Sequence, residues 1–202
     1  MHHSAKTRSQ TAVLPRNSAL IVTAEISNLL RSAGIAVAGS AFIALCAHIS
    51  IPLFFTPVPV TLQPFAVLAL GLLLSPELAM AATAAYLAEG ALGLPVFTPH
   101  GPGGLLQLLG PTGGYLLSYP LVAPVVASLW RRVRPTYFTA FAIAGAASLV
   151  TLAAGAAWLA LITHAAPQTI LTQAILPFLP GDALKVAAAA GLAMGARRFR
   201  RR

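Results

Sequence analysis

Charged residues are scarce in this sequence. Only 8% of its 202 residues are Asp, Glu, Lys or Arg, whereas soluble domains contain about 25%. Hydrophobic residues make up 57% of the chain, so lipid is the expected surroundings for most of it. The composition argues against an ordinary soluble domain and predicts an all-α integral membrane protein.

Acidic residues are especially few. Four Asp and Glu stand against thirteen Lys and Arg, which gives a formal net charge of +9. Such a charge would suit a nucleic-acid-binding protein, but its distribution does not. The basic residues gather before the first long apolar segment, in a loop at 131–134 and after residue 196, which is a pattern of membrane topology. We therefore expect membrane lipid, with anionic lipid near the tail, and no nucleic acid.

Other chemical groups are also missing. Cys46 is the single cysteine and lies inside an apolar segment, which excludes disulfides within the chain and cysteine-rich metal sites. The five histidines show no ligand spacing such as HExxH, so no metal or other cofactor is assigned. No GxxxxGK[ST] nucleotide motif occurs, so any energy input from nucleotide hydrolysis must come from another chain, with a gradient as the other source.

The N-terminal region, residues 1–32, is basic and is expected in the cytoplasm. Because it lacks an apolar core of about 7–15 residues followed by a cleavage site, we do not expect a cleaved signal peptide. Residues 19–31 place apolar side chains at roughly helical spacing beside Glu25 and Arg31, which predicts an interfacial helix.

Six apolar segments follow, and most approach the length of about 20 residues that crosses a bilayer. They form an expected six-helix membrane domain over 33–196, followed by a basic tail at 197–202. The expected spans are 33–51, 62–75, 77–93, 113–130, 137–163 and 173–196.

Six spans place both termini on one side of the membrane. With that side in the cytoplasm, the loops around 52–61, 94–112 and 164–172 lie outside, and none of them contains Lys or Arg. Of the thirteen basic residues, all but Lys185, which lies within the sixth span, then fall on the inside. This is what the positive-inside rule expects of cytoplasmic termini.

Small residues recur every fourth position in the first span, at Ala36, Ser40 and Ala44. They form one helix face that another helix backbone can approach closely. Packing within the chain and docking onto a partner protein are equally compatible with this pattern.

The stretch from Tyr86 to Tyr115 is rich in glycine and proline and connects two apolar spans. Glycine and proline predict a well-defined non-helical connection. Irregular backbone at membrane depth is tolerated only where protein buries it or where it lines a cavity. We interpret the stretch as the mobile lid or wall of a small-molecule site, with an exposed linker as the alternative.

Two charged residues, Asp182 and Lys185, lie inside the sixth span, three positions apart and thus on one helix face. A charge near a membrane helix centre costs about 2.5–3.5 kcal/mol and usually marks a function. The alternatives are a structural ion pair or snorkelling to the interface. Pro180 and Gly181 directly precede the pair and predict a helix break with free backbone donors that favour an anion.

Polar groups from four elements lie at about the same membrane depth, in the outer halves of the expected spans. They predict a ligand cavity that offers a cation to a ligand carboxylate and an acid and amides to a polar ring of the ligand, with aromatic walls at Phe97 and Tyr115. Each aromatic residue alone is more often a core or interfacial residue. The polar and phenolic members are Thr61, Gln63, Tyr86, Glu89, Asp182 and Lys185.

Four ordered motifs resemble the BioY family, the biotin-binding S components of energy-coupling factor (ECF) transporters: TPVPVTLQPF at 56–65, YLAEGALGLPVF at 86–97, GPTGGYL at 110–116 and PGDALK at 180–185. The similarity spans about 35–196. It implies a six-helix protein of the bacterial cytoplasmic (inner) membrane that captures biotin with high affinity from outside. It also implies a transmembrane coupling subunit, met by the face of Ala36, Ser40 and Ala44, and two ABC ATPases, although some members work without a dedicated coupling subunit.

The resemblance also implies binding residues. Asp182 and Lys185 are expected to bind biotin, with Gln63 and the loop residues Gly103, Gly104, Thr112 and Gly113 completing the pocket. Our physical assignment gives Lys185 the valerate carboxylate and Asp182 the ureido N–H groups, and Asp182 merely orienting Lys185 is the alternative. An arginine that the family's loop between the third and fourth helices can carry has no counterpart in 98–109, where His100 is the possible cation.

Three other functions stay open at this point. A membrane-embedded enzyme is disfavoured, because Asp182, Lys185 and Glu89 with scattered histidines fit no hydrolase or metal arrangement, and no catalytic residue is assigned. A structural or assembly subunit would explain the small-residue faces but not the two charges in the sixth span. A transporter of another small carboxylate would use the same residues.

Overall fold

The computed structural model describes the backbone of residues 16–200 and the side chains of 25–199. Residues 1–15 and 201–202, with their part of the basic N-terminal region and tail, lie outside this description. The elements in order are α1 (Arg16–His48), β1 (Ser50–Ile51), β2 (Val60–Thr61), α2 (Gln63–Leu73), α3 (Pro76–Ala91), α4 (Gly104–Leu109), α5 (Gly113–Arg132), α6 (Tyr137–Thr163), α7 (Pro167–Ile170), the π-helical turn η1 (Leu171–Ile175) and α8 (Leu179–Arg200).

The chain divides into two compact units, residues 1–33 and 34–202. The described part of the first unit is helical throughout and forms the beginning of α1. The helix expected over 19–31 and the span expected to begin at residue 33 are therefore not separate: α1 continues without a break from Arg16 to His48. No glycine–proline pair or turn sequence interrupts this stretch, which explains its continuity.

The protein is mostly helical, and three described helices are long and apolar enough to cross a membrane: Glu25–His48 within α1, α5 and α6. A fourth span is reached if the bent pair Pro167–Ala174 and Leu179–Phe199, which meet at 45°, counts as one. The expected second and third spans are short helices, α2 of 11 residues and α3 of 16. At 1.5 Å per residue they are roughly 17 and 24 Å long, less than the roughly 30 Å hydrocarbon core.

Local sequence explains where several helices begin. The Ser75 side chain accepts a hydrogen bond from the N–H of Leu78 (3.3 Å), and Pro76 occupies the first turn of α3. Before α6, Thr136 and Thr139 form a reciprocal capping box. Serine and threonine caps satisfy N–H groups that the first helical turn leaves free, and proline at this place lacks the N–H that would be unpaired. His164, in a left-handed conformation, ends α6.

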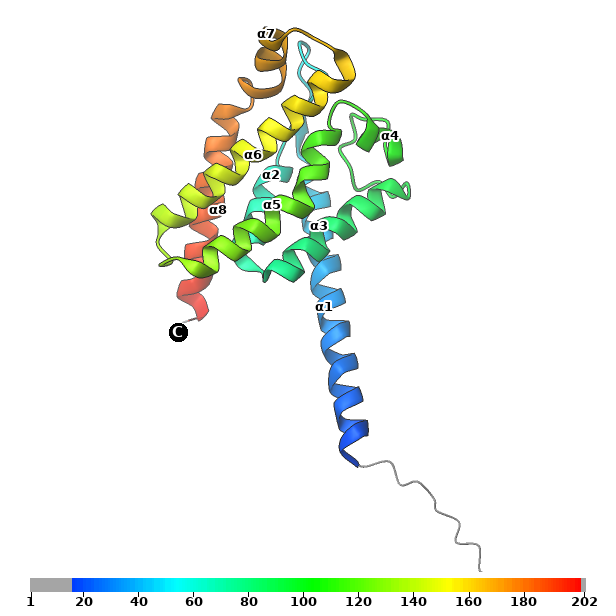
Figure 1. Ribbon diagram of the computed structural model, residues 1–202, viewed down its shortest axis with the longest axis vertical. Helices are drawn as coiled ribbons and strands as arrows, with labels where there is room; N and C mark the ends of the chain where they lie inside the picture. Colours follow the sequence, from blue (N-terminus) through cyan, green and yellow to red (C-terminus); the bar gives the residue numbers. More distant parts are fainter. Residues whose placement is uncertain (1–15, 201–202) are drawn as a thin grey trace, which may run out of the picture. The chain divides into compact units, whose positions relative to one another are not determined.

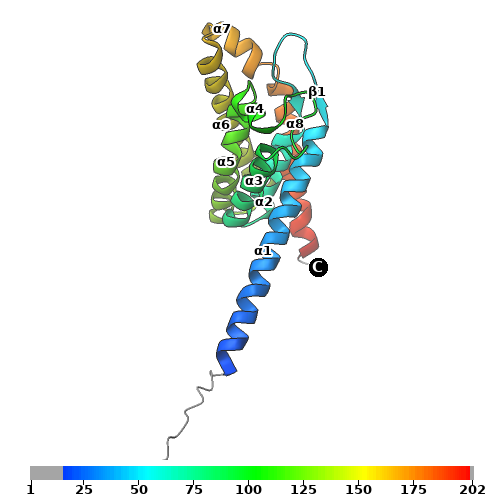
Figure 2. The same cartoon turned by 90° about the vertical axis from the view of Figure 1, so that its right-hand side faces the viewer.

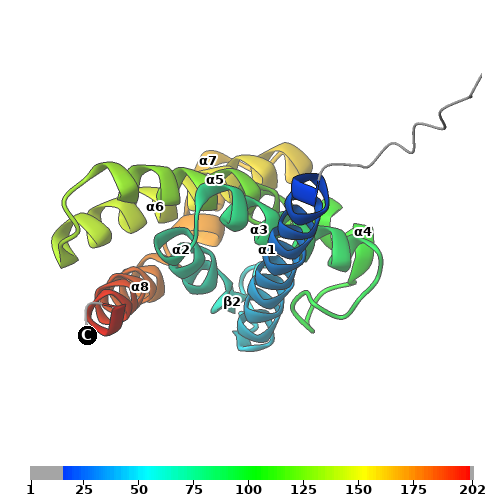
Figure 3. The same ribbon diagram turned by 90° about the horizontal axis from the view of Figure 1, so that it is seen from below.

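Within residues 34–202 the helices pack in layers around α5. Helix α5 contacts α2, α3 and α6, while α8 contacts α2 and α6; Figure 3 shows these helices from below. Small residues bring helices close together. A Cβ on Gly39 of α1 would lie 2.7 Å from Ala82 Cβ of α3, and one on Gly71 of α2 would lie 2.8 Å from Val126 Cβ of α5. Lipid is as apolar as the helix surfaces, so the hydrophobic effect does not drive helices together in a membrane. Close van der Waals contacts of this kind stabilise helix packing there.

The loops and short elements of this unit gather at one end of the long helices (Figures 1 and 2). That end carries the β1–β2 hairpin, in which Ser50 pairs with Thr61 and Ile51 with Val60, together with α4 and α7. The α5–α6 turn and the end of α8 lie at the opposite end. The three loops expected to share one side thus share one end, and the arginines of 131–134 and 197–198 lie at the other.

Two local expectations are corrected by the structure. The connection between α3 and α5 is not wholly non-helical, because it contains the short helix α4. The helix interruption lies before Leu179 rather than at Pro180–Gly181, so both residues sit in the first turn of α8, where proline is tolerated. The N–H of Asp182 bonds to the carbonyl of Phe178 (2.8 Å) and is not a free donor.

Candidate ligand-binding site

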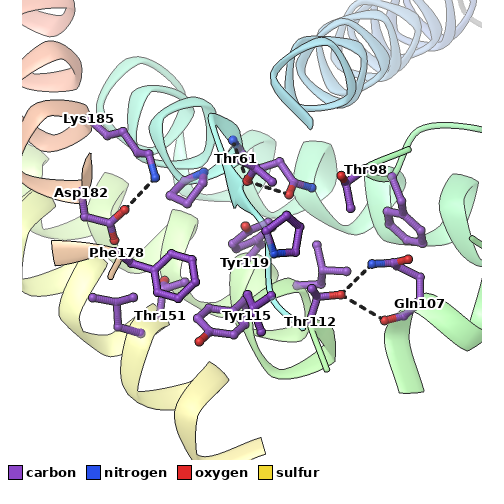
Figure 4. A pocket seen from close by; sticks show the side chains of 17 residues that line it. Thr61, Thr98, Gln107, Thr112, Tyr115, Tyr119, Thr151, Phe178, Asp182 and Lys185 are labelled. Atoms are coloured by element: carbon purple, nitrogen blue, oxygen red, sulfur yellow. Dashed lines mark hydrogen bonds and ion pairs between the residues drawn. The ribbon is translucent and has the colours of Figure 1, made fainter. Parts of the chain in front are cut away.

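A cavity opens among the helices at the end that carries the loops. The empty space between its lining side chains is about 530 Å³, including the opening to solvent. Figure 4 shows its lining side chains. They come from the segment leading into α2, from the loop after α3, and from α4, α5, α6 and α8. The polar and phenolic members are Thr61, Gln63, Thr98, Gln107, Thr112, Tyr115, Tyr119, Thr151, Asp182 and Lys185.

An ion pair occupies one side of the cavity. Lys185 Nζ lies 2.8 Å from Asp182 Oδ1, and the two residues are only 7% and 6% exposed. The Ser148 hydroxyl of α6 donates to Asp182 Oδ2 (2.8 Å). One oxygen of Asp182 thus faces the lysine and the other a neutral donor, so the carboxylate is held in one orientation. Because the ammonium has three protons and Asp182 accepts one, Lys185 retains donors for a ligand.

A second polar group lies at the start of α2. The Thr61 hydroxyl donates to Gln63 Oε1 (3.0 Å), and Gln63 Nε2 donates to the hydroxyl of Tyr86. Tyr86 is fully buried behind Gln63 and packs edge-on against Phe97, with 5.3 Å between ring centroids. Tyr86 therefore holds the Gln63 amide in one orientation from outside the cavity lining.

The loop side is organised by Gln107 of α4. Its Nε2 donates to the Thr112 hydroxyl (2.7 Å), and its Oε1 accepts from the N–H of Gly103 (3.5 Å). Gly103 and Gly104 have φ values of 68° and 58°, a left-handed conformation that glycine adopts without steric cost. The buried Gln107 side chain thus ties the beginning of α4 to the beginning of α5.

Aromatic rings form the wall between these groups. Tyr115 of α5 donates through its hydroxyl to the carbonyl of Ala174 (2.7 Å) and lies 6.1 Å from the Phe178 ring, centroid to centroid. A Cβ on Gly155 of α6 would lie 2.2 Å from the Tyr115 ring. The phenol can lie flat against α6 only because that position is glycine. The π-helical turn before α8 supplies the Ala174 carbonyl, and Phe178, just beyond that turn, lines the cavity.

A family model matches this arrangement of motifs. The model of the BioY family covers residues 16–202, nearly the whole chain. The chain belongs to the BioY family.

Individual BioY proteins are similar over most of their length. The chain is 40% identical over 134 residues to the probable biotin transporter BioY of Pyrococcus horikoshii, covering 66% of this chain and 76% of that protein. It is 36% identical over 156 residues to the biotin transporter BioY of Thermotoga maritima, covering 77% and 89%.

A solved structure shares the fold. The chain matches a crystal structure at 2.1 Å described as the S-component for biotin from an ECF-type ABC transporter, with a TM-score of 0.77 and 26% identity. The match covers 87% of this chain and 94% of the other. Family membership and the apolar helices together make this chain a multi-pass membrane protein of a transporter family, not an enzyme.

Of the residues predicted for the BioY-like site, four line the cavity: Asp182, Lys185, Gln63 and Thr112. Thr61, Phe97 and Tyr115, expected from their depth, line it as well. The structure does not place the other predicted residues in the lining. They are Tyr86, Glu89, Gly103, Gly104 and Gly113.

These five residues contact the lining residues or lie further away. Tyr86 bonds to Gln63, and Gly103 to Gln107. Glu89 is half-buried and accepts a hydrogen bond from Ser40. At Gly113 a Cβ would lie 1.9 Å from the carbonyl oxygen of Leu108, so glycine there lets α4 and α5 meet. Direct ligand contact by these residues stays a prediction.

The small-residue face of α1 packs within the chain. Ala36 and Ser40 are buried and Ala44 is half-buried. This burial favours the intramolecular alternative, while contact of the same face with a partner stays a prediction.

Sequence reasoning missed Thr98, Gln107, Tyr119, Thr151 and Phe178 as lining residues. Tyr119 stands four residues after Tyr115 on one face of α5, a signal that the helical period offered. Thr98 and Gln107 had no comparable signal, because their positions depend on how the loop and α4 fold back over the cavity.

Proposed function

We propose that this chain is the biotin-binding S component of an ECF-type uptake transporter. Membership of the BioY family carries the proposal, and the cavity supplies the physical counterpart. It has aromatic walls and contains a buried ion pair in which Lys185 retains hydrogen-bond donors for a ligand. Retaining two charges in an apolar interior is costly, and a polar ligand that completes them gives a reason for their presence.

The ion pair suits the ureido ring of biotin. A ureido group presents one carbonyl acceptor flanked by two N–H donors, and Lys185 beside Asp182 presents a donor next to an acceptor. A carboxylate at the same place would meet the Asp182 charge at close range. We therefore assign the ureido ring to both residues, in place of the division in which Lys185 takes the carboxylate. Because the two side chains lie together, one end of an extended ligand contacts both.

The carboxylate then points toward the loop side, where Thr98, Gln107 and Thr112 lie opposite the ion pair (Figure 4). The valerate chain passes the rings of Tyr115, Tyr119 and Phe178. Apolar contact along the chain and polar groups at both ends select a ligand of this pattern. Another small carboxylate with a cyclic urea or amide is the alternative substrate.

We further propose a six-segment membrane domain, formed by α1, α2, α3, α5, α6 and α8 over 33–196, with the ligand site in its outer half. Both termini lie in the cytoplasm in this proposal, because the arginines of 131–134 and 197–198 occupy the end opposite the cavity. The helix expected at the interface over 19–31 would be the first part of α1, and 197–202 the cytoplasmic tail. We propose the bacterial cytoplasmic (inner) membrane as the localisation.

The Gly-rich connection would act as a mobile lid. Tight capture of a small ligand requires a closed, preorganised pocket. The segment from Gly101 to Thr112 folds over the cavity and is held at Gly103 and Thr112 by one side chain, Gln107. Opening would need those hydrogen bonds to break, together with the bond that Trp158 Nε1 of α6 donates to the Gly110 carbonyl (2.9 Å).

Energy for uptake would come from a transmembrane coupling subunit and two ABC ATPases, because no nucleotide motif occurs in the sequence. The face of Ala36, Ser40 and Ala44 could meet a coupling subunit only along its half-buried edge at Ala44. Work without a dedicated coupling subunit is the alternative.

Binding of radiolabelled biotin to the detergent-purified chain tests the function. We expect saturable, submicromolar binding at one site per chain, displaced by unlabelled biotin. Absence of biotin binding by folded protein would overturn the proposal. Binding of a different cyclic urea or carboxylate instead would support the alternative substrate.

A further inference from the structure

The Thr98 hydroxyl is buried and unpaired. Thr98 is 6% exposed, and its Oγ1 is one of two buried side-chain polar atoms without a hydrogen-bond partner among the residues that the structure describes. The other, Ser50 Oγ, does not line the cavity, whereas Thr98 does. Buried hydroxyls nearly always have partners, so an orphan one in a binding cavity needs an explanation.

The two amide side chains that line the cavity bond to residues other than Thr98. The Gln107 amide bonds to Thr112 and Gly103, and the Gln63 amide to Thr61 and Tyr86. A ligand would therefore not need to displace an internal hydrogen bond to reach the Thr98 hydroxyl.

The position of Thr98 is fixed by its surroundings. Its carbonyl accepts a hydrogen bond from the N–H of Gly101 (3.4 Å). The preceding residue, Phe97, is buried against Tyr86, and a Cβ on Gly90 would lie 2.1 Å from the Phe97 ring. The Phe97 ring thus fills the space beside the glycine and anchors the backbone that carries Thr98. A donor held this way is preorganised for its acceptor.

We infer that the Thr98 hydroxyl donates a hydrogen bond to the ligand at the side of the cavity opposite Asp182 and Lys185. This rests on the proposed function: with the ureido ring at the ion pair, the acceptor is the biotin carboxylate. Lys185 is the single cation among the described lining residues, so the carboxylate has to be held by neutral donors. A hydroxyl that donates to a carboxylate forms a charge-assisted bond, stronger than a bond between neutral groups.

Two substitutions distinguish the effect of the Thr98 hydroxyl on binding from the effect of the side-chain shape. Thr98→Val keeps the branched shape without the donor, and Thr98→Ser keeps the donor without the methyl group. We expect Thr98→Val to weaken biotin binding about tenfold or more, the effect of losing one hydrogen bond to a charged group. Thr98→Ser should stay within about threefold of the natural protein.

An analogue that keeps the bicyclic ring but has a methyl group in place of the carboxylate identifies the acceptor. Thr98→Val should change its affinity by less than about twofold. Equal weakening of both ligands would place Thr98 elsewhere on the ligand and overturn the assignment. Unchanged biotin affinity in Thr98→Val would overturn the inference while leaving the proposed function intact, because the natural protein would still bind biotin.

Stability without ligand gives an independent readout. Since the hydroxyl has no internal partner, Thr98→Val should unfold at the same or a higher temperature than the natural protein in the absence of biotin. A clearly lower unfolding temperature would show that the hydroxyl serves the fold, and would overturn the inference. Failure of the natural protein itself to bind biotin would instead count against the proposed function.

Discussion

The Ser40 hydroxyl of α1 donates a hydrogen bond to the Glu89 carboxylate of α3. Ser40 is fully buried and Glu89 half-buried, so the bond ties the second part of α1 to α3 beside the close contact of Gly39 with Ala82. Neither residue lines the cavity. The bond therefore stabilises the packing of α1 against α3. It can affect ligand binding only indirectly, through the position of α3.

We expect Ser40→Ala to destabilise the protein by about 1.5–3 kcal/mol, the usual contribution of a hydrogen bond to a charged group, with little change in biotin affinity. Thermal unfolding and biotin binding of the same preparation measure the two effects. Ser32→Ala, at an exposed position of α1, is the matched control and should change neither. A loss of biotin affinity of about tenfold in Glu89→Gln would instead show that Glu89 contacts the ligand directly.

The ion pair gives the second prediction. Lys185→Met should abolish tight biotin binding and also lower stability, because it leaves the Asp182 charge buried without its partner. Adding Asp182→Asn should restore stability, since the double variant is neutral, but not binding. Biotin binding and thermal unfolding of the single and double variants check this. Arg131→Ala, at the opposite end of the helices, serves as control, and a double variant that binds biotin normally would contradict a binding role.

The orientation of the ligand can be tested separately. If the ureido ring lies at Asp182 and Lys185, Lys185→Met should weaken biotin and biotin methyl ester by the same factor, because both retain the ring. Should Lys185 pair with the carboxylate, the loss for biotin would exceed that for the ester by about tenfold, as expected for one charge-assisted contact. Competition binding with both ligands distinguishes these arrangements.

Periodicity and local chemistry predicted part of this molecule well. The expected fifth span at 137–163 coincides with α6, because a capping threonine and a polar loop mark its ends. The pairing of Asp182 with Lys185 followed from their spacing of three residues. In these cases the determining contacts lie within one helix or at its termini.

Other features depend on distant contacts and could not be read from local sequence. Gln107 lies on a short helix whose position is set by its bonds to Gly103 and Thr112. Thr98 is buried because Phe97 packs against Tyr86. Gly113, predicted to contact the ligand, lies close against the carbonyl of Leu108, a contact that its motif does not indicate. A glycine-rich motif looks the same in sequence whether glycine admits a ligand or another backbone.

Gly113 offers a test of this distinction. Gly113→Ala would place a methyl group 1.9 Å from the Leu108 carbonyl oxygen, so α4 and α5 would have to move apart. We expect a lower unfolding temperature with or without biotin. Gly191→Ala in α8, where a Cβ meets nothing within 4 Å, is the matched control and should be neutral or stabilising by about 0.5–1 kcal/mol. Normal stability with lost biotin affinity would indicate direct contact with the ligand at Gly113.

Gln107 gives the last prediction, which concerns the lid. Gln107→Leu keeps the side-chain volume roughly constant but removes the bonds to Thr112 and Gly103. With each bond contributing about 0.5–1.5 kcal/mol, the closed loop should open more often and biotin should dissociate several-fold to about 100-fold faster. Hydrogen exchange of the amides between Gly101 and Thr112 should rise in parallel, while Gln168→Leu, at an exposed position on α7, should alter neither. An unchanged dissociation rate together with faster exchange would show that opening of this loop does not limit ligand release, and the lid would then have to lie elsewhere around the cavity.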